Sequence, residues 1–390
     1  MIEHLTEKKK MVFLLNDMQT GGVQKSIIAL LKYLVGRNQY EIDLIIWEQG
    51  GILEKEVPSE VNIIYHSYPP TLVDIKKEKK LSVKTKYLFQ YIRFKWFSVV
   101  LQKPWCYFDS VQKQYDIAVS FVHRGYPLFY TIDKIFAKKK VLWFHHGIYE
   151  ATEKQKALDK VYFRLYDKII AVSESNQAEM IHYFPELRNK LEVISNLIDI
   201  EDIRQKAEEA NCDIDTSGKE SIFVTVSRIS KEKGIDLALD VASILKEKRI
   251  KFKWYFVGDG PLLSSMKEKA LALHLSDNCI FLGAKSNPYS YMKQADFYIQ
   301  TSFVEAHPIT INEALVLKKI IIATNLNSVS AVLQNDELGM LCEPNVDVFA
   351  NSIEQLMYND TLRKQLQEEV DKHTVSNEIA CKKINELVEL

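Results

Sequence analysis

The chain has 390 residues, of which 47% are apolar and 26% are charged, as in an ordinary globular protein. A chain of this length favours two domains over one. The formal net charge of −1 excludes a surface that attracts polyanions throughout, so nucleic acid is not an expected partner.

Neither the cysteines nor the N-terminal residues indicate export. The five cysteines are scattered and form no CxxC pair, which is typical of reduced thiols in a cytosolic protein. The first apolar run is followed at once by Asn16 and Asp17, so it is too short for a secretory signal or a membrane span. We therefore expect a cytoplasmic protein.

Short apolar runs recur along the chain, separated by segments with helical periodicity. Runs that are apolar throughout, rather than alternating, predict strands buried on both faces of a parallel sheet. They lie at 11–16, 42–47, 61–66, 115–121, 140–146, 168–173 and 191–195 in the first half, and at 221–227, 254–259, 279–283, 296–300 and 319–324 in the second. The repeated order of strand, helix and strand predicts an α/β fold with parallel sheets.

The polar segment 200–220 divides this pattern into two passes. We therefore expect two doubly wound α/β domains that face each other across a cleft, the first over 1–196 and the second over 197–371. The residues after Val346 carry no strand pattern and predict closing helices, with the last one within 372–390. In such sheets, ligands bind at the carboxyl ends of strands, where the helices begin.

The segment 299–324 has the densest group of candidate functional residues. A strand end, a polar turn closed by Pro308 and a new helix follow one another, an arrangement that points free backbone N–H groups at an anion. Glu305 lies in the turn and Glu313 lies inside the helix. This arrangement predicts a cradle for a ligand with a diphosphate at one end and hydroxyls at the other.

Two further junctions lie in the first half. Gly21 and Gly22 follow the first predicted strand, where they either form a tight turn or let the backbone approach a ligand. The GxGxxG spacing of a dinucleotide site is absent. His145 and His146 follow the fifth strand, where one of the two could hold a sugar hydroxyl or a phosphate oxygen. No HExxH motif or Cys/His cluster is present, so no metal site is predicted.

The second half adds a basic junction after its first strand. Arg228 offers planar bidentate contacts and Lys233 a point charge, so together they would neutralise a diphosphate leaving group, unless they belong only to a solvated basic loop. The turn 258–262, GDGPL, lacks the Lys-Ser/Thr of a P-loop and predicts a structural role, with an edge that could meet a ligand. The triplet Asp213-Ile214-Asp215 lies in the polar segment between the domains, and we interpret it as solvated linker charge.

Four pieces in this order resemble the GT-B fold sugar transferases of glycosyltransferase family 4. They are GGVQKSIIALL, VSRISKEKGID, FVGDGPL and the E-x7-E spacing of Glu305 and Glu313. The resemblance covers nearly the whole chain and is strongest from 221 to 344. It implies two Rossmann-like domains, with the donor on the C-terminal one and the final helix crossing back to the N-terminal one.

The resemblance also implies roles for individual residues. Arg228 and Lys233 resemble the diphosphate pair, Glu313 the ribose ligand and Glu305 the carboxylate that contacts the donor sugar. The other implied contacts are Gly21 and Gly22, the cleft histidine His145, the backbone N–H groups of Ile309, Thr310 and Ile311, and the base loop of Gly283, Ala284 and Lys285. The family has Gly-x-Pro where this chain has Lys318-Lys319-Ile320, and a lysine at a left-handed cap is less favourable than a glycine.

The implied function is a retaining, metal-independent transfer of a sugar from a nucleotide-sugar, with a UDP-sugar favoured. The acceptor would be a hydroxyl of a glycan or lipid-linked molecule in cell-surface polysaccharide or glycolipid synthesis, and no cofactor is expected. No residue is an evident covalent nucleophile, so front-side substitution is favoured and double displacement stays open. The alternatives are a catalytically silent partner subunit, which would lack residues such as Arg228 or Glu305, and a nucleotide-sugar epimerase.

The stretch 76–105 has nine Lys or Arg residues, one Glu and seven interleaved aromatic residues. A solvated basic helix is one interpretation, and single-stranded nucleic acid is another that nothing else supports. Basic residues mixed with Trp, Phe and Tyr also suit a segment that lies on anionic lipid headgroups. We therefore predict peripheral contact with the inner face of the plasma membrane, close to a lipid-linked acceptor.

Overall fold

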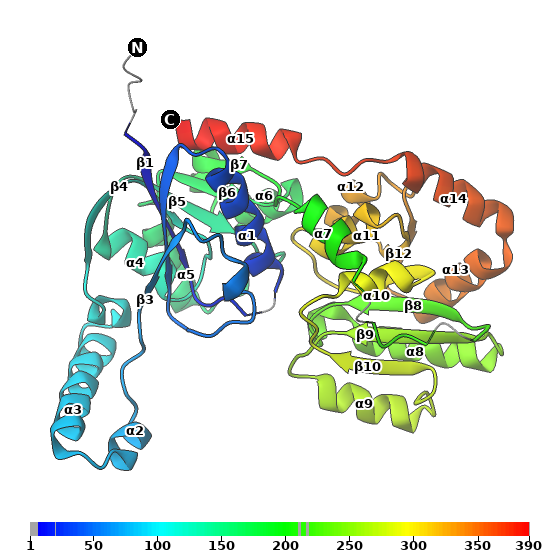
Figure 1. Ribbon diagram of the computed structural model, residues 1–390, viewed down its shortest axis with the longest axis horizontal. Helices are drawn as coiled ribbons and strands as arrows, with labels where there is room; N and C mark the ends of the chain where they lie inside the picture. The colour runs from blue at the N-terminus through cyan, green and yellow to red at the C-terminus, as the bar shows by residue number, and fades with distance from the viewer. Residues whose placement is uncertain (1–6, 20, 210–211, 216–217, 390) are drawn as a thin grey trace.

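The computed structural model describes residues 7–19, 21–209, 212–215 and 218–389. Two parallel sheets form two lobes that lie side by side (Figure 1). The first sheet has a hydrophobic cluster on each face, and so has the second. The predicted fold class, two doubly wound parallel-sheet domains, is confirmed.

The first lobe contains a seven-stranded sheet in the order β3-β2-β1-β4-β5-β6-β7. Its strands are β1 (Lys9–Leu15), β2 (Tyr40–Ile46), β3 (Asn62–Tyr65), β4 (Val111–Ser120), β5 (Ile135–Phe144), β6 (Lys168–Ala171) and β7 (Leu191–Val193). Successive side chains of β1 enter opposite clusters, Phe13 on one face and Val12 on the other. A strand covered on both faces needs an unbroken apolar run, which is why the sequence pattern predicted it.

The second lobe contains a six-stranded sheet in the order β10-β9-β8-β11-β12-β13. Its strands are β8 (Ser221–Val226), β9 (Phe252–Val257), β10 (Cys279–Gly283), β11 (Phe297–Gln300), β12 (Ile320–Thr324) and β13 (Met340–Cys342). Every strand predicted from an apolar run is present in one sheet or the other. Among the strands of the described residues, only β13 was not predicted, because its three residues are too few to form a recognisable run.

Helices cover both sheets. The α-helices are α1 (Gly22–Gly36), α2 (Leu72–Lys77), α3 (Leu81–Lys95), α4 (Tyr126–Lys134), α5 (Glu153–Phe163), α6 (Glu174–Tyr183), α7 (Ile200–Ala207), α8 (Ile235–Glu247), α9 (Leu263–Ala272), α10 (Tyr289–Gln294), α11 (Ile309–Val316), α12 (Asn327–Val332), α13 (Val346–Tyr358), α14 (Asp360–Lys372) and α15 (Glu378–Glu389). The shorter turns are η1 (Glu54–Glu56), η3 (Pro104–Tyr107), η4 (Pro185–Lys190) and η5 (Lys231–Lys233), with a π-helical turn, η2 (Trp96–Val100).

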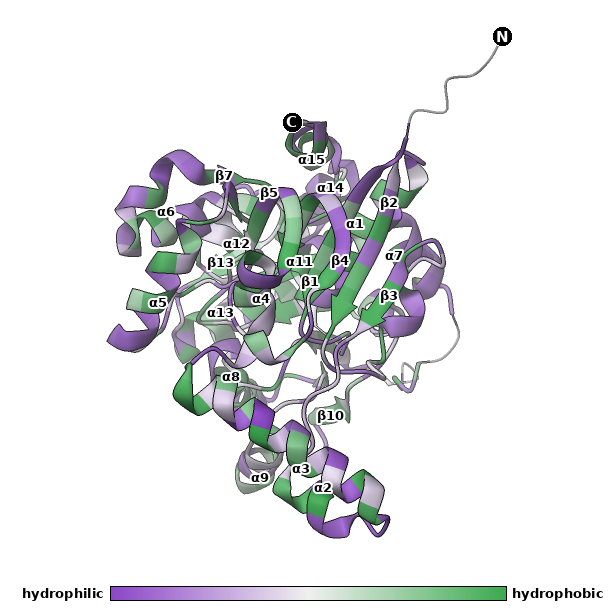
Figure 2. Cartoon of the chain, turned by 90° about the vertical axis from the view of Figure 1, so that its left-hand side faces the viewer, coloured by the Kyte–Doolittle hydropathy of each residue, from purple (hydrophilic) through white to green (hydrophobic). Residues whose placement is uncertain are grey.

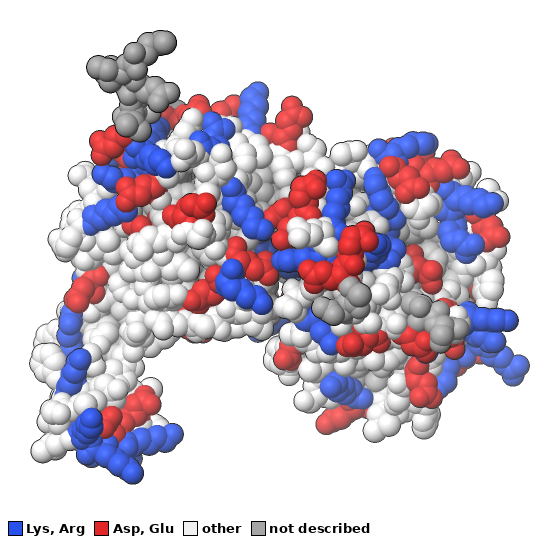
Figure 3. All heavy atoms as spheres, viewed as in Figure 1, with Lys and Arg blue, Asp and Glu red and all other residues white. Residues whose placement is uncertain are grey.

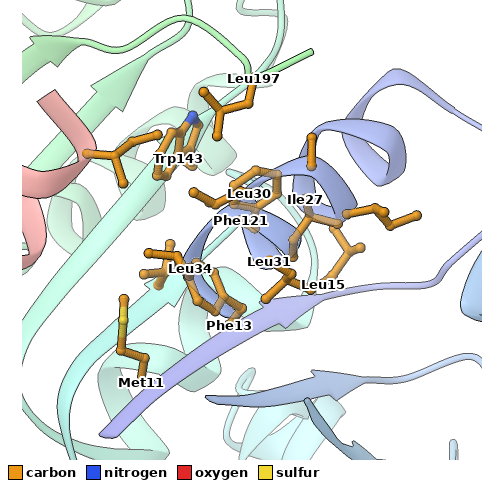
Figure 4. Close-up of a cluster of buried hydrophobic side chains, with 14 of the residues drawn as sticks. Met11, Phe13, Leu15, Ile27, Leu30, Leu31, Leu34, Phe121, Trp143 and Leu197 are labelled. Carbon is orange, nitrogen blue, oxygen red and sulfur yellow. The ribbon is translucent and has the colours of Figure 1, made fainter. Parts of the chain in front are cut away.

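Helix α1 fixes the edge of the first lobe that meets the second. Ile27, Leu31 and Leu34 recur at helical spacing and enter the cluster that contains Phe13 of β1 and Phe121 (Figure 4). Since this apolar face fixes the rotation of α1, it also fixes where the first turn of the helix points. The Gly21-Gly22 pair therefore lies at the junction between the lobes.

The final helix crosses back to the first lobe (Figure 1). Ile384 and Leu387 of α15 pack into the same cluster as α1 and β1. Lys139 Nζ, on β5, donates to the Leu387 carbonyl at 2.9 Å, where the end of a helix leaves carbonyls unpaired. The segment that leads into α15 lies against the other interlobe connection, because Asn377 donates to the Ile198 carbonyl at 2.7 Å and accepts from its N–H at 3.0 Å.

Lys318 stands after α11, where the resemblance implies a glycine. It adopts the left-handed conformation, with φ of 58°, which costs a non-glycine residue about 1–2 kcal/mol. Its Nζ donates to the carbonyls of Val370 at 3.1 Å, Asp371 at 2.9 Å and His373 at 2.5 Å, around the end of α14. The strained turn therefore places an ammonium where a helix end needs donors.

Helices α2 and α3 form an arm, residues 72–101, that projects from the first lobe (Figures 1 and 2). No residue of α3 is buried. The base of the arm is held by the buried side chains of Trp105 and Phe108. Within the described residues, no helix combines the length and the apolar character needed to cross a membrane.

Candidate active site

A cleft of about 630 Å³ lies between the lobes and is lined by residues of both. Its walls follow the carboxyl ends of β1, β8, β9, β10 and β11, as expected for doubly wound sheets. The predicted site residues that line it are Gly21, Gly22, Arg228, Lys233, Ala284, Lys285, Glu305, Ile309 and Thr310. The fold therefore brings together most of the residues singled out from the sequence.

Glu305 accepts hydrogen bonds from three side chains on one oxygen. Lys233 Nζ lies 2.7 Å from Oε1, Ser302 Oγ lies at 2.8 Å and Gln300 Nε2 at 2.9 Å. The main-chain carbonyl of Glu305 accepts from Ser328 Oγ at 2.7 Å. The side chain is 10% exposed, so its orientation is fixed before any ligand arrives. A carboxylate with this many donors is a weak nucleophile.

Glu313 lies in a small recess that adjoins the cleft. It is 2% exposed, and Lys25 Nζ, from α1 of the other lobe, lies 2.7 Å from its Oε1. Tyr289 OH donates to the same oxygen at 3.0 Å. The second oxygen, Oε2, is buried and has no hydrogen-bond partner among the described residues. Half of this carboxylate is therefore available to a further donor.

The glycines of GDGPL hold the loop that presents Arg228. A Cβ on Gly258 would lie 1.8 Å from the Ser227 carbonyl oxygen, and one on Gly260 would lie 2.4 Å from that of Ile229. Only glycine allows this close approach of two main chains. Arg228 itself is exposed at the wall of the cleft. The turn therefore supports the site by holding the loop that presents Arg228 to the cleft.

The start of α11 differs from the expectation that three backbone amides face an anion. The Ile309 N–H donates to the His307 carbonyl at 2.9 Å, and the Ile311 N–H to the Pro308 carbonyl at 3.1 Å. Ile311 is also fully buried and does not line the cleft. The helix starts with a tight turn that uses two of the three amides, so this part of the prediction requires correction.

The expectation that His145 faces the cleft is not met. Its ring lies between aromatic neighbours, 4.6 Å from the Phe121 ring and stacked at 6.4 Å on Trp143, and neither it nor the exposed His146 lines the cleft. Burial lowers the pKa of His145 to about 3. The histidine that lines the cleft is His307, from the turn before α11, and burial lowers its pKa to about 4. Both imidazoles are therefore neutral.

The base loop is tied to the segment between the lobes. Lys285 Nζ lies 2.9 Å from Asp213 Oδ2, whereas Gly283, with φ of 72°, ends β10 and does not line the cleft. Asp215 pairs with Lys253 at 3.0 Å. The two aspartates are exposed, as predicted, but each is ion-paired to the second lobe. No group of three or more His, Cys, Asp or Glu in the described part of the chain is placed to hold a metal ion.

Sequence reasoning missed several residues of the site. Lys25 and Tyr289 surround Glu313, and Gln300 and Ser302 surround Glu305. Lys25 lies three residues after the Gly21-Gly22 pair, so its place in the first turn of α1 was the only available signal. The partners of Lys25 come from the other lobe, and no local pattern indicates them.

Two family models match the chain in succession. The model described as Glycosyltransferase Family 4 matches residues 20–202, and the one described as Glycosyl transferases group 1 matches residues 207–373. Together they cover both lobes. The chain belongs to glycosyltransferase family 4.

Two curated proteins show how this family 4 chain relates to others. It is 27% identical over 168 residues to an uncharacterised glycosyltransferase of Methanocaldococcus jannaschii, covering 43% of this chain and 41% of that one. It is 28% identical over 200 residues to N-acetylgalactosamine-N,N'-diacetylbacillosaminyl-diphospho-undecaprenol 4-alpha-N-acetylgalactosaminyltransferase of Campylobacter jejuni, covering 51% and 53%. The matches span about half the length of these relatives.

Solved structures extend the likeness to the whole family 4 chain. A mutant of S. aureus TarM, crystallised with fondaparinux, alpha-GlcNAc-glycerol and UDP, superposes with a TM-score of 0.73 and covers 98% of this chain and 100% of its own. The sequence identity is 15%, so this likeness shows the fold alone.

Proposed function

We propose that the protein is a retaining, metal-independent glycosyltransferase that uses a nucleotide-sugar, preferably a UDP-sugar. The acceptor is a hydroxyl of a glycan or lipid-linked molecule in cell-surface polysaccharide or glycolipid synthesis. The observation that carries this proposal is the interlobe cleft, where Arg228 and Lys233 meet two carboxylates, Glu305 and the adjoining Glu313. Cations for a diphosphate and carboxylates for hydroxyls are the complement of a nucleotide-sugar.

The donor is assigned to the second lobe. Arg228 and Lys233 hold the diphosphate with the start of α11, where Thr310 faces the cleft. Glu313 takes the ribose hydroxyls and Glu305 those of the transferred sugar. Gly21 and Gly22 allow the first lobe to approach, since a Cβ on Gly22 would already lie 3.3 Å from Ile309 Cδ1. Ala284 and Lys285 border the base, and UDP is favoured because it occupies the similar TarM structure.

The reaction we propose is a front-side substitution. The acceptor oxygen bonds to the anomeric carbon on the face from which the diphosphate departs. The electron pair of the broken bond stays on the diphosphate, which also receives the proton of the acceptor. Arg228 and Lys233 stabilise the charge that develops there, so no metal ion or cofactor is required. The three donors on Glu305 Oε1 support a binding role for this carboxylate rather than a covalent one.

We propose further that the arm, residues 72–101, rests on an anionic membrane. Nearly half of the exposed large hydrophobic side chains belong to this short segment, and Leu81, Phe89 and Trp96 are 76%, 69% and 57% exposed. Lys and Arg side chains gather at its far end (Figure 3). An apolar stripe flanked by lysines suits lipid chains beneath anionic headgroups. The Campylobacter relative acts on a diphospho-undecaprenol acceptor, which supports a lipid-linked acceptor here.

The arm also supports a proposal for where the enzyme acts. We propose a cytoplasmic protein at the inner face of the plasma membrane. The structure keeps all five cysteines free, which suits a reducing compartment. The hollow between the arm and the second lobe would then open toward the membrane surface, where an acceptor is anchored (Figure 3).

The decisive experiment follows the release of UDP. The protein is incubated with a panel of UDP-sugars, with and without lipid-linked acceptors, and free UDP is measured. A transferase releases UDP in step with glycosylated product. A silent subunit releases none, and an epimerase yields another nucleotide-sugar with no net release of UDP. Lys233→Ala should abolish release, whereas Lys231→Ala, an exposed lysine of the same turn, should not.

A further inference from the structure

Each of the two carboxylates assigned to the donor is held by a lysine. Lys233 Nζ lies 2.7 Å from Glu305 Oε1, within the second lobe. Lys25 Nζ lies 2.7 Å from Glu313 Oε1, and this pair joins the two lobes. If a carboxylate that binds the ligand is already paired with a lysine, the lysine must either keep that contact beside the ligand or move away when the ligand binds.

The geometry of Glu313 decides between sharing and leaving. Two neighbouring ribose hydroxyls bind a carboxylate best when each donates to its own oxygen. The buried Oε2 has no partner among the described residues and can accept from one of them, but Oε1 already accepts from Lys25 and Tyr289. The recess around Glu313 holds only about 30 Å³, so a ribose hydroxyl that reaches Oε1 takes the place of one of the two present donors.

Lys25 is the donor that can leave. Tyr289 is 6% exposed and packs with α11 in the core of the second lobe, so its hydroxyl has nowhere to move. Lys25 reaches across from the first lobe on a flexible side chain that is 25% exposed. It lines both the recess around Glu313 and the main cleft that contains Arg228. An ammonium released from Glu313 therefore already faces the space assigned to the diphosphate.

We propose that Lys25 exchanges partners when the donor binds, leaving Glu313 to the ribose and moving to the diphosphate. The exchange conserves charge, because one ion pair is replaced by another and no proton is transferred. Lys25 thereby adds a cation from the first lobe to Arg228 and Lys233 of the second. It acts as a positioning residue that ties the first lobe to the donor, and this inference rests on the proposed function.

The test compares two ligands that differ only in the diphosphate, uridine and UDP. Their dissociation constants are measured by calorimetry for the wild type and for Lys25→Met. Uridine should bind the variant more tightly, because the competitor for Glu313 is gone. The advantage of UDP over uridine should shrink about tenfold, because a charge-assisted contact of ~1.5 kcal/mol to the phosphates is lost.

Two controls isolate the exchange. Lys25→Arg keeps the cation and should keep most of the UDP advantage. Lys138→Met, in the same lobe, removes a lysine that pairs with Asp116 at 2.7 Å and lines neither the cleft nor the recess, so it should change the binding of neither ligand. If Lys25→Met weakens the binding of uridine and UDP equally, or weakens the binding of uridine at all, the proposed exchange is wrong. Lys25→Gln replaces Lys25→Met if the latter does not fold.

The same measurements separate this inference from the proposed function. If the wild type binds neither UDP nor any other nucleoside diphosphate, the proposed function fails. If it binds one of them but the ratio of the two constants does not change in Lys25→Met, only the exchange fails. Where the base is not uracil, the nucleoside and diphosphate of the preferred base replace uridine and UDP.

Discussion

Glu305 and Glu313 both hold a lysine ammonium at 2.7 Å, but the rest of their surroundings differ. Glu305 lines the open cleft, close to where the transferred sugar would lie. Three side chains donate to its Oε1 and hold it in place. Glu313 lies in a recess beside it, with one oxygen free of partners among the described residues. The first position suits the reacting sugar and the second suits a part of the donor that does not change.

Removing each carboxylate should therefore have a different effect. Glu313→Ala should raise the Kd for UDP about tenfold to a hundredfold, since charge-assisted hydrogen bonds of ~1.5–3 kcal/mol are lost. Glu305→Ala should lower the turnover number by more than it raises that Kd. Calorimetry and initial rates measure the two effects, and the exposed Glu337→Ala in the same lobe is the matched control. The opposite pattern would mean that the two roles are exchanged.

His145 and His307 make folding stability depend on pH. Both have folded-state pKa values well below the ordinary value of 6.5, about 3 and about 4, because burial disfavours the charged ring. The unfolded chain therefore binds more protons below pH 6.5, so stability is complete above that pH and is lost as the pH falls toward 4. At pH 5 the loss is ~2 kcal/mol for each histidine.

Urea unfolding between pH 7 and pH 5 tests this expectation. His307→Gln should reduce the loss of stability over that range by ~2 kcal/mol, because glutamine does not titrate. His145→Gln should do the same, and the double variant should be the least sensitive to pH. If the free energy of unfolding of the variants changes with pH as steeply as that of the wild type, the two rings are protonated at the same pH in the folded and unfolded chains.

At the scale of single elements, the arm carries the sharpest prediction. Arg93 is tied to Asp109 at 3.0 Å, so it contributes less to a membrane contact than its charge suggests. Lys84 and Lys86 are exposed and remain the better candidates. Lys84→Glu combined with Lys86→Glu should weaken binding to anionic vesicles about tenfold or more, at ~1 kcal/mol for each charge removed.

The apolar stripe of the arm needs its own variant. Phe89→Ser combined with Trp96→Ser should weaken binding to the same vesicles without changing the net charge. Leu271→Ser, an exposed apolar residue of the second lobe, is the matched control. Vesicle flotation measures both sets, with neutral phosphatidylcholine vesicles beside anionic ones. Equal binding of wild type and variants to anionic vesicles would contradict a role of the arm at the membrane.

The elements also show how far the sequence leads. Strands such as β8 and β12 were predictable because burial on both faces requires an unbroken apolar run. The Lys25–Glu313 pair was not, because it depends on how two lobes meet. His145 was assigned to the cleft from its place after β5, but the direction of its ring is set by Phe121 and Trp143. The position of a residue along the chain predicted which end of the sheet it lies at, and packing decided which side chain faces the ligand.

For the whole molecule, the donor site is built from two separate lobes, so a donor should stabilise the folded protein as a unit. A nucleotide at ~100 times its Kd adds about 2.7 kcal/mol to the free energy of unfolding. Thermal shifts with UDP, GDP and ADP and their sugars should therefore identify the base, with UDP giving the largest increase in Tm. Arg228→Ala should remove most of that increase. The absence of a shift with every nucleotide would count against a nucleotide-sugar donor.

The two hydrogen bonds between Asn377 and Ile198 restrict how the lobes can move relative to each other. When two connecting segments lie side by side and are bonded to each other, the two lobes can rotate about one axis, and rotation about other axes is restricted. We therefore expect the opening of this molecule to be described by a single coordinate. Spectroscopic labels on the arm and on α9 should then report one distance that shortens with UDP. Asn377→Ala should broaden that distance distribution, because a second axis of rotation becomes available.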